Sequence, residues 1–337
     1  AKSIAQAAIR HGGLNAFLRE HLAGRDVDQG ALFSEPVIEG AASYRSSGRT
    51  PAELSGELVH PKVAEALTAG SPGDDYRFVH PAYAHQVEAW RLLSPQKRNS
   101  VLVSSGTGSG KTECFLIPLL NDLAEESERE GRLSGVRALM LYPLNALIAS
   151  QEQRLCQWTR PFGGKIRFGL YNGLMKDARK HDRDRAEEAT PEQVLYRRTL
   201  RSDPPPILVT NNTMLEYMTI RKQDQPILER SRGKLRWIII DEAHSYVGSA
   251  AAEVSLLLRR VLQAFEVEPE NVRFVATSAT IGGSDEAAKA DLRRYLADLS
   301  GAPIENVHVV FGDREEVSLP ASSGQAGPLE AVAIRSQ

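Results

Sequence analysis

Residues 101–117 read Val-Leu-Val-Ser-Ser-Gly-Thr-Gly-Ser-Gly-Lys-Thr-Glu-Cys-Phe-Leu-Ile, and this stretch decides the fold. It predicts a short buried strand, then a glycine-rich turn, then a helix. In such a turn the backbone N–H groups and the helix N-terminus bind phosphate. Lys111 adds a positive charge near the β- and γ-phosphates, and the Thr112 hydroxyl can coordinate Mg²⁺. The predicted phosphate site consists of Ser105, Gly106, Thr107, Gly108, Ser109, Gly110, Lys111 and Thr112.

One position departs from the general pattern of phosphate-binding loops. That pattern has a glycine six residues before the lysine, and here the position is Ser105. The turn must therefore close without a glycine at this point. A glycine-rich loop that binds nothing is the alternative, and the strand before the loop and the helix after it favour the phosphate site.

The bulk composition limits the class of protein. The chain has 337 residues, of which 42% are hydrophobic and 25% charged, enough for one large domain with appendages or for two domains. A net charge of −2 excludes a global basic field, so nucleic acid would have to bind along a local track. Cys114 and Cys156 lack metal-type spacing and are expected to be reduced, in keeping with a cytoplasmic location. No apolar run is long enough to predict a membrane span.

Seven apolar runs alternate with helical patterns along the chain. Each run is expected to be a strand, and the runs are 101–103, 136–141, 165–170, 207–209, 237–240, 272–276 and 307–311. This alternation predicts an α/β fold with a mostly parallel sheet that is covered by helices on both faces. Ligands of such sheets bind beyond the carboxyl ends of the strands.

The domain boundaries are predicted from shifts in composition. Residues 1–75 are expected to form a mainly helical N-terminal accessory region, and residues 76–312 the main domain. Within the main domain, residues 174–204 are polar and charged, which indicates an insertion or long loop. The arginines of 197–201 could contact nucleic acid or lie in a solvated mobile loop. Residues 313–337 are rich in Ser, Gly, Pro and Ala and are predicted to be a linker or tail.

Polar residues follow the strand predicted at 237–240. Asp241 would hold Mg²⁺, usually through water, and Glu242 would orient and deprotonate an attacking water. His244 could relay between this site and the end of the next strand, or be merely structural. The residues at that next strand end are Ser278 and Thr280.

Two further helix starts carry polar side chains that could contact ligands. Gln86 lies in a helix just upstream of the phosphate loop, and its carboxamide could bond both N6 and N7 of adenine, while Tyr83 or His85 could stack on the base. An incidental glutamine on a surface helix is the alternative.

Pro143 and Asn145 lie at the start of another helix. These two residues could contact phosphates, or the helix start could be an ordinary capped one.

In their order along the chain these motifs resemble superfamily 2 helicases of the DEAD/DEAH-box type. Residues 104–112, 241–244 and 278–280 are similar to motifs I, II and III of that family. The other matches are Tyr83–Gln86 with the adenine-reading glutamine motif, Tyr142–Gln151 with motif Ia, and Thr210–Tyr217 with a later motif that contacts the nucleic-acid backbone. The family accepts a small residue in place of the first loop glycine, which accounts for Ser105. The resemblance covers about residues 80–311.

The resemblance implies a RecA-like P-loop domain that binds ATP and Mg²⁺ and couples ATP hydrolysis to a nucleic acid. DNA is favoured over RNA, with phosphate contacts from Pro143, Asn145, Thr210 and Asn211. The sequences of segments 142–147 and 234–237 resemble those of large bacterial helicases of the MrfA, Druantia and DISARM type. This resemblance implies a role in phage defence or DNA repair, together with partner proteins.

The resemblance also implies that a second RecA-like domain completes the motor. Too few residues follow Phe311 for that domain, so the chain is expected to be the first motor domain of a longer protein, and to be weakly active or inactive alone. Two alternatives remain open. One is an RNA helicase or a translocase that moves on duplexes without unwinding them, and the other is a non-catalytic scaffold for partner proteins.

Overall fold

The computed structural model describes residues 13–14, 16–17, 42–70, 76–177, 184–185, 188–279 and 285–315. The chain divides into two compact units, Ala1–Ala42 and Ser43–Gln337. Residues 43–70, which composition assigned to an accessory region, therefore belong to the same unit as the main domain. Within the described residues, no helix is long and apolar enough to cross a membrane.

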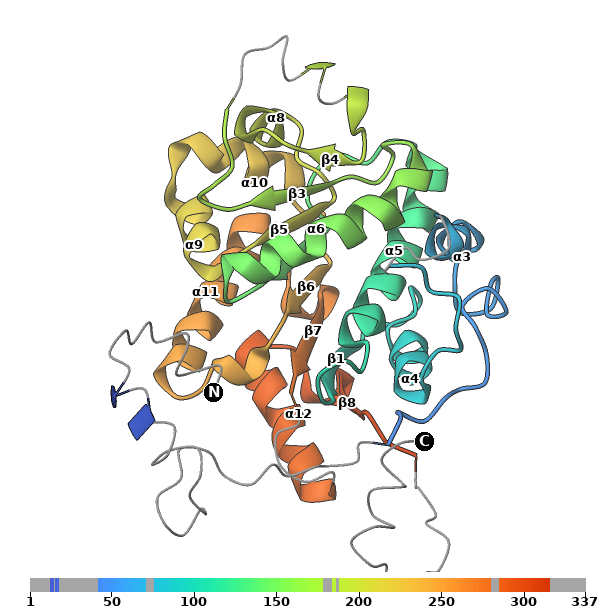
Figure 1. Ribbon diagram of the computed structural model, residues 1–337. Helices are drawn as coiled ribbons and strands as arrows, with labels where there is room; N and C mark the ends of the chain where they lie inside the picture. The colour runs from blue at the N-terminus through green and yellow to red at the C-terminus, as the bar shows by residue number, and fades with distance from the viewer. Residues whose placement is uncertain are drawn as a thin grey trace, which may run out of the picture. The chain divides into compact units, whose positions relative to one another are not determined.

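A parallel sheet of eight strands runs through the second unit, in the order β4-β3-β5-β2-β6-β7-β1-β8 (Figure 1). The seven predicted runs all contribute strands, and β4 is an addition. The bounds are β1 (Ser100–Ser104), β2 (Ala138–Leu141), β3 (Phe168–Tyr171), β4 (Gln193–Val194), β5 (Ile207–Thr210), β6 (Trp237–Ile240), β7 (Arg273–Ser278) and β8 (Val307–Phe311).

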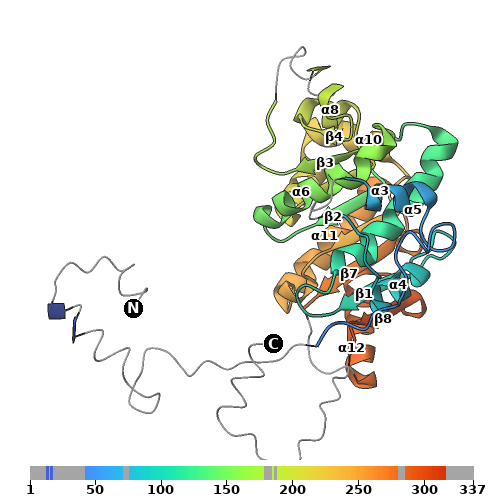
Figure 2. The same cartoon turned by 45° about the vertical axis from the view of Figure 1, so that its right-hand side comes forward.

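Helices cover both faces of the sheet because alternate residues of each strand point to opposite sides. In β1, Val101 and Val103 enter one hydrophobic core, whereas Leu102 enters the other. The first core packs under α3 (Pro61–Thr68), α4 (Ala84–Leu92), α5 (Lys111–Glu130) and α6 (Asn145–Thr159). The second packs under α8 (Arg197–Ser202), α9 (Asn212–Ile220), α10 (Gln225–Ser231), α11 (Ser249–Phe265) and α12 (Glu286–Ser300). Figures 1 and 2 show the two groups on opposite sides of the strands.

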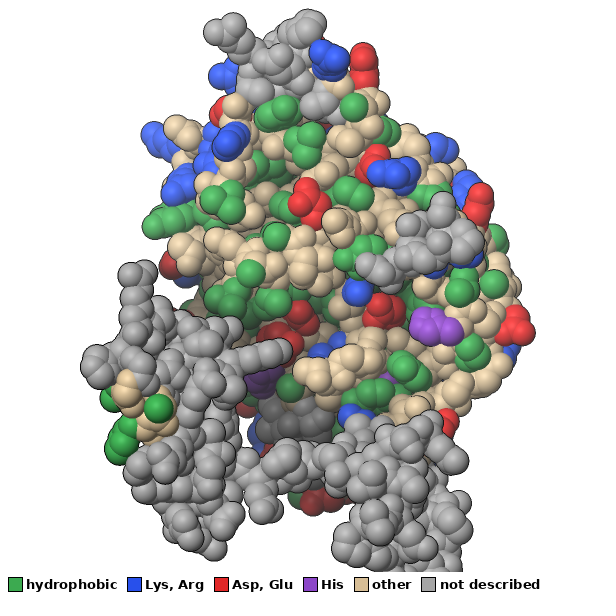
Figure 3. Space-filling model, in the orientation of Figure 1, with side chains coloured by type: hydrophobic (Ala, Val, Ile, Leu, Met, Phe, Trp, Pro, Cys, Tyr) green, Lys and Arg blue, Asp and Glu red, His purple; other side chains and the backbone are tan. Residues whose placement is uncertain are grey.

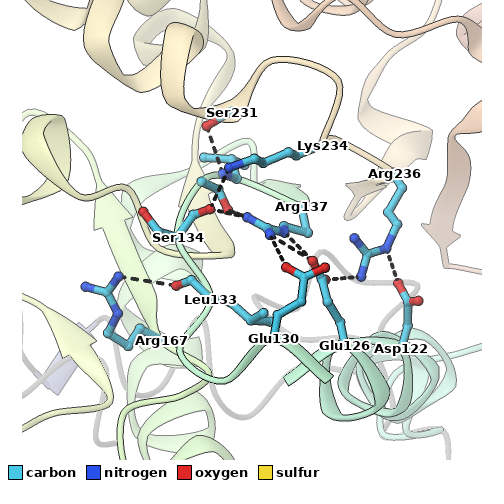
Figure 4. Close-up of polar contacts among 12 residues, drawn as sticks. Asp122, Glu126, Glu130, Leu133, Ser134, Arg137, Arg167, Ser231, Lys234 and Arg236 are labelled. Carbon is cyan, nitrogen blue, oxygen red and sulfur yellow. Dashed lines mark hydrogen bonds and ion pairs between the residues drawn. The ribbon is translucent and has the colours of Figure 1, made fainter. Parts of the chain in front are cut away.

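Ion pairs fasten the amino-terminal edge of the sheet to α5 (Figure 4). Arg137, just before β2, donates two hydrogen bonds to Glu126 Oε1, at 3.0 and 2.7 Å. Arg236, just before β6, donates to Asp122 at 2.6 Å and also pairs with Glu126. Because all strands are parallel, this edge is opposite to the one where ligands are expected, so the network is structural.

The segment predicted as an insertion or loop contributes β4 and α8, although 178–183 and 186–187 lie outside the described residues. Arg201 donates to Asp224 Oδ1 at 2.8 Å, and the Tyr171 hydroxyl donates to Oδ2 at 2.6 Å. Arg197 lies over the Tyr171 ring and donates to the backbone carbonyl of Asn172. These two arginines therefore hold the edge of the sheet and do not lie in a solvated loop, whereas a contact with nucleic acid stays a prediction.

Candidate active site

The glycine-rich turn between β1 and α5 closes through two serine side chains. Ser105 Oγ lies 2.6 Å from Ser109 Oγ, and both residues are buried. This hydroxyl pair takes the place of the glycine that the general loop has at position 105. Gly110 has φ +71°, in the left-handed region that favours glycine, and a Cβ there would lie 2.2 Å from Gln86 Nε2. Gly110 is therefore required by its conformation and by the close approach of Gln86.

Lys111 begins α5 and turns its ammonium group back over the loop. Its Nζ donates to the carbonyl oxygens of Ser105 at 2.9 Å and Gly106 at 3.3 Å. The loop opens into a cleft of 490 Å³, and Figure 3 shows side chains of both charges close together in the lower middle of the face it displays. The cleft is lined by Thr107–Glu113, by Asp241 and Glu242, and by Tyr76, Arg77, Phe78, His80, Pro81, Tyr83, Gln86, Arg154 and Trp158.

The two acidic residues after β6 are held by Thr277 near the end of the neighbouring β7. The Thr277 hydroxyl donates to Asp241 Oδ1 and accepts from the backbone N–H of Glu242 at 3.2 Å. Burial raises the pKa of Asp241 and the charge of Glu242 adds to the rise, whereas the Thr277 hydrogen bond and Lys111 oppose it. Glu242 has φ +51°, a conformation that side chains avoid and that is often found at functional positions.

The oxygen atoms that could ligate a metal in the cleft fit a magnesium ion that is bound together with a nucleotide. Within the described residues, no three or more His, Cys, Asp or Glu side chains are grouped so that they could hold a metal ion. The Thr112 hydroxyl and the Asp241 carboxylate both line the cleft and are oxygen ligands. Mg²⁺ in nucleotide sites uses one or two such ligands and takes the rest from phosphates and water.

Gln86 connects the start of α4 to the phosphate loop. Its Oε1 accepts from the Tyr83 N–H at 2.8 Å, and its Nε2 donates to the Gly110 carbonyl at 3.1 Å. His85 is buried and its ring stacks on that of Tyr83. Its Nε2 lies 2.8 Å from the Ser109 carbonyl oxygen, and burial lowers the pKa of the imidazole. Tyr83 lines the cleft, so it is the better placed of the two aromatic side chains to stack on a base.

Comparison with known proteins identifies the family. The model of the DEAD/DEAH box helicase family matches residues 83–288, which include the loop and both acidic residues. The chain belongs to the DEAD/DEAH box helicase family. As in its members, the eight-stranded sheet is a RecA-like fold.

Two curated relatives illustrate the match. The chain is 26% identical over 404 residues to "Druantia protein DruE" of Escherichia coli, covering 92% of this chain and 21% of DruE. It is also 26% identical over 256 residues to "Uncharacterized ATP-dependent helicase YprA" of Bacillus subtilis, covering 75% of this chain and 30% of YprA. The chain thus spans less than a third of the length of either relative.

Solved structures share the fold of this helicase domain. The DUF1998 helicase MrfA bound to DNA and AMPPNP matches with a TM-score of 0.53 at 23% identity, covering 81% of this chain and 31% of MrfA. The DEAD-box helicase Mss116 bound to ssRNA and UDP-BeF matches with a TM-score of 0.56 at 14% identity, covering 80% of this chain and 46% of Mss116.

The helicase domain brings two of the three predicted coupling residues close to the cleft. His244 Nδ1 lies 3.1 Å from a carboxylate oxygen of Glu242 and 3.4 Å from the backbone nitrogen of Ala279. The Ser278 carbonyl accepts from the Ser105 N–H at 3.2 Å. Thr280 lies outside the described residues. Sequence reasoning missed Thr277 as a site residue, because its sequence signal is no more than a position directly after the strand predicted at 272–276.

The four residues predicted to contact nucleic acid differ in their burial. Asn145 and Asn211 form a hydrogen-bonded pair at the surface, Pro143 is half-buried, and Thr210 is fully buried. Asn211 caps α9 by accepting from the Met214 N–H at 2.8 Å, and its Nδ2 donates to Asn145 Oδ1 at 2.8 Å. Thr210 is 0% exposed and its hydroxyl donates to the Tyr171 carbonyl at 2.7 Å. Thr210 is predicted to contact phosphates, and its hydroxyl, which faces the neighbouring strand, does not make such a contact in this arrangement.

Proposed function

We propose that this chain is the ATP-binding first motor domain of a helicase or translocase that acts on DNA. The supporting observation is that the phosphate loop and the acidic pair line one cleft at the carboxyl edge of the sheet. In this proposal Lys111 binds the β- and γ-phosphates, and Thr112 and Asp241 hold Mg²⁺. Glu242 accepts the proton of the attacking water, and Mg²⁺, if held there by Thr112 and Asp241, would neutralise phosphate charge.

DNA is the proposed track, with Asn145 and Asn211 contacting backbone phosphates. The pair lies where α6 and α9 begin, and N–H groups at helix N-termini attract phosphates. Such contacts give binding that is independent of sequence and sensitive to salt. The similar fold of MrfA, solved with DNA, supports this proposal, whereas that of Mss116, solved with ssRNA, supports the alternative of an RNA track.

A phage-defence or DNA-repair pathway is proposed on two grounds, the resemblance in sequence and the similarity to DruE. The relatives are several times longer than this chain, so we propose that a second RecA-like domain completes the motor. The cleft would then be closed from the opposite side by that domain. By itself the 337-residue chain should bind Mg²⁺–ATP, hydrolyse it slowly and not separate strands.

Nucleotide binding and turnover in the complete protein test the assigned roles. Lys111→Ala should abolish ATP binding, whereas Glu242→Gln should bind ATP and hydrolyse it at least about a hundredfold more slowly. Glu253→Gln, on the exposed side of α11, is the matched control and should behave as wild type. Wild-type turnover by the Glu242 variant would refute its role, and absence of ATP binding by the unaltered protein would favour the scaffold alternative.

Stimulation of ATP hydrolysis identifies the track. We expect single-stranded or duplex DNA to raise the rate of the complete protein, with an effect that declines steeply as salt is added. Stimulation by RNA alone would refute the DNA proposal. Stimulation by duplex DNA without strand separation would identify a translocase, and strand separation by this chain alone would show that no second domain is needed.

A further inference from the structure

Tyr44 lies beside the phosphate loop, although the sequence around it indicates no chemistry. The backbone of residues 43–46 pairs on one side with the segment that leaves β8, since Arg45 N–H donates to the Asp313 carbonyl at 2.9 Å and Glu315 N–H to the Ser43 carbonyl at 2.8 Å. Figure 1 shows the blue chain meeting the orange end beyond β8 at the lower right. On the other side, the Ala84 N–H donates to the Arg45 carbonyl at 2.8 Å. Tyr44 thus connects the start of α4 with the exit of the chain from the sheet.

The Tyr44 side chain packs directly against the loop and is only 7% exposed. A Cβ at Gly106 would lie 2.7 Å from Tyr44 Oη, which is closer than Cβ atoms come to other atoms. The Tyr44 ring centroid lies 5.4 Å from that of His85, and His85 in turn contacts the Ser109 carbonyl. The ring therefore supports the first part of the loop by contact and the later part through His85.

The segment after β8 packs against both the Tyr44 ring and the loop. Gly312 N–H donates to the Ser104 carbonyl at 3.0 Å, and a Cβ at Gly312 would lie 2.5 Å from Ser105 Cβ and 3.0 Å from Tyr44 Cε1. The Arg314 guanidinium lies over the ring at 4.8 Å and its Nη2 donates to Oη at 3.5 Å. A cation over an aromatic face is attracted by the ring, so Arg314 helps to hold the Tyr44 ring in place beside the loop.

We propose that Tyr44 is a positioning residue that keeps the phosphate loop in its binding conformation and ties it to the segment leaving β8. The inference rests on the proposed ATP binding. Lys111 donates to the Gly106 carbonyl, so a displacement of Gly106 also displaces an acceptor that holds the Lys111 ammonium. Because Tyr44 Oη and Arg314 Nη2 both border the space beside Gly106, the loop cannot move into that space without displacing these side chains.

A clash and its relief test this contact. In the 337-residue chain, binding of N-methylanthraniloyl-ATP with Mg²⁺ is measured by fluorescence, and the melting temperature is measured in parallel. Gly106→Ala should weaken binding on the order of tenfold, because the new methyl group meets Tyr44 Oη. Adding Tyr44→Phe removes that oxygen and should restore most of the affinity. Tyr44→Leu, which removes the ring from His85 and Arg314, should weaken binding with the Gly106 backbone left unchanged.

Two control variants separate a local effect on the loop from general destabilisation. Gly173→Ala places the same methyl group where nothing lies within 4 Å, and Tyr171→Phe removes a buried hydroxyl at the far edge of the sheet. Neither should change nucleotide affinity, although the second should lower the melting temperature. Normal binding by Gly106→Ala, or no recovery in the folded double variant, overturns the role of Tyr44. No binding by the unaltered chain would instead overturn the proposed ATP site, and the two failures are therefore distinguishable.

Discussion

Replacing Glu126 with glutamine tests whether the ion pairs at the amino-terminal edge stabilise the domain. The Glu126 side chain is 8% exposed and pairs with Arg137, whose side chain is 4% exposed, and with Arg236. Among the residues that the structure describes, Glu126 is the one carboxylate that pairs with both guanidinium groups, and its substitution leaves Arg137 buried. Breaking a buried pair by removing one partner costs about 3–5 kcal/mol. In a domain of this size the melting temperature should fall on the order of 10 °C.

Glu130→Gln is a matched control, because Glu130 pairs with the same guanidinium. Its carboxylate lies 3.7 Å from Arg137 Nη2, but its side chain is 58% exposed, so the loss should stay below about 1 kcal/mol. Thermal and urea unfolding of both variants measure the difference, with nucleotide binding as a check that the folded state is intact. Equal losses for the two glutamates would refute the argument from burial.

The pH dependence of this stabilisation has a definite sign. Burial by itself raises the pKa of Glu126, but the hydrogen bonds and charges of Arg137 and Arg236 outweigh it and hold the pKa below the ordinary value of 4.5. A carboxylate whose pKa is lowered by folding stabilises the native state fully above its unfolded pKa, and that contribution is lost as pH falls through the folded pKa. The stability difference between wild type and Glu126→Gln should therefore be constant near neutral pH and narrow below 4.5. A difference that is unchanged in acid would show that charge does not cause it.

Two further substitutions test the edge of the sheet and the proposed nucleic-acid contact. Asp224→Asn should destabilise the domain by about 2–4 kcal/mol in urea unfolding, because the fully buried carboxylate accepts from both Tyr171 and Arg201. It should also lower the pKa of Tyr171, which burial and Asp224 together raise to about 12, and an ultraviolet titration would detect the change. Asn211→Ala removes the cap of α9 and the bond to Asn145, which should cost about 1 kcal/mol and weaken DNA binding in an anisotropy assay. Asn211→Ser should keep the cap and lose only the bond to Asn145.

The sequence predicts those parts of the fold that depend on residues close together along the chain. The continuous run of apolar residues Trp237–Ile240 indicates a strand that is buried on both faces, and the structure confirms this burial. Glycines around Lys111 indicate a tight turn before a helix, and Gly108 and Gly110 indeed adopt positive φ. Because the polar residues follow parallel strands, their meeting at one edge also follows from the pattern.

The parts that sequence does not predict depend on partners far along the chain. The strand β4 has two residues, too few for an alternating pattern to identify. Arg197 and Arg201 look like solvated charges until Tyr171 and Asp224 are placed beside them. Tyr44 is more than sixty positions from Gly106 in a segment of loop-like composition, and only the fold brings its hydroxyl to the phosphate loop. The contact of Gln86 with adenine stays a prediction, whereas its bonds to Tyr83 and Gly110 show that its carboxamide is part of the scaffold.

Polar residues at strand ends either anchor the strand end or project from it, and the degree of burial distinguishes the two kinds. Thr210 and Thr277 are both 0% exposed, and each hydroxyl bonds to the end of a neighbouring strand, Thr210 to the Tyr171 carbonyl and Thr277 to Asp241. Each threonine thereby fixes a strand end next to a side chain that we propose to contact a ligand, namely Asn211 for nucleic acid and Asp241 for Mg²⁺. A threonine can do this because its hydroxyl satisfies a buried acceptor while its methyl group packs in the core. In both places a fully buried threonine therefore lies beside a half-buried polar side chain, and replacing the threonine should also displace that side chain.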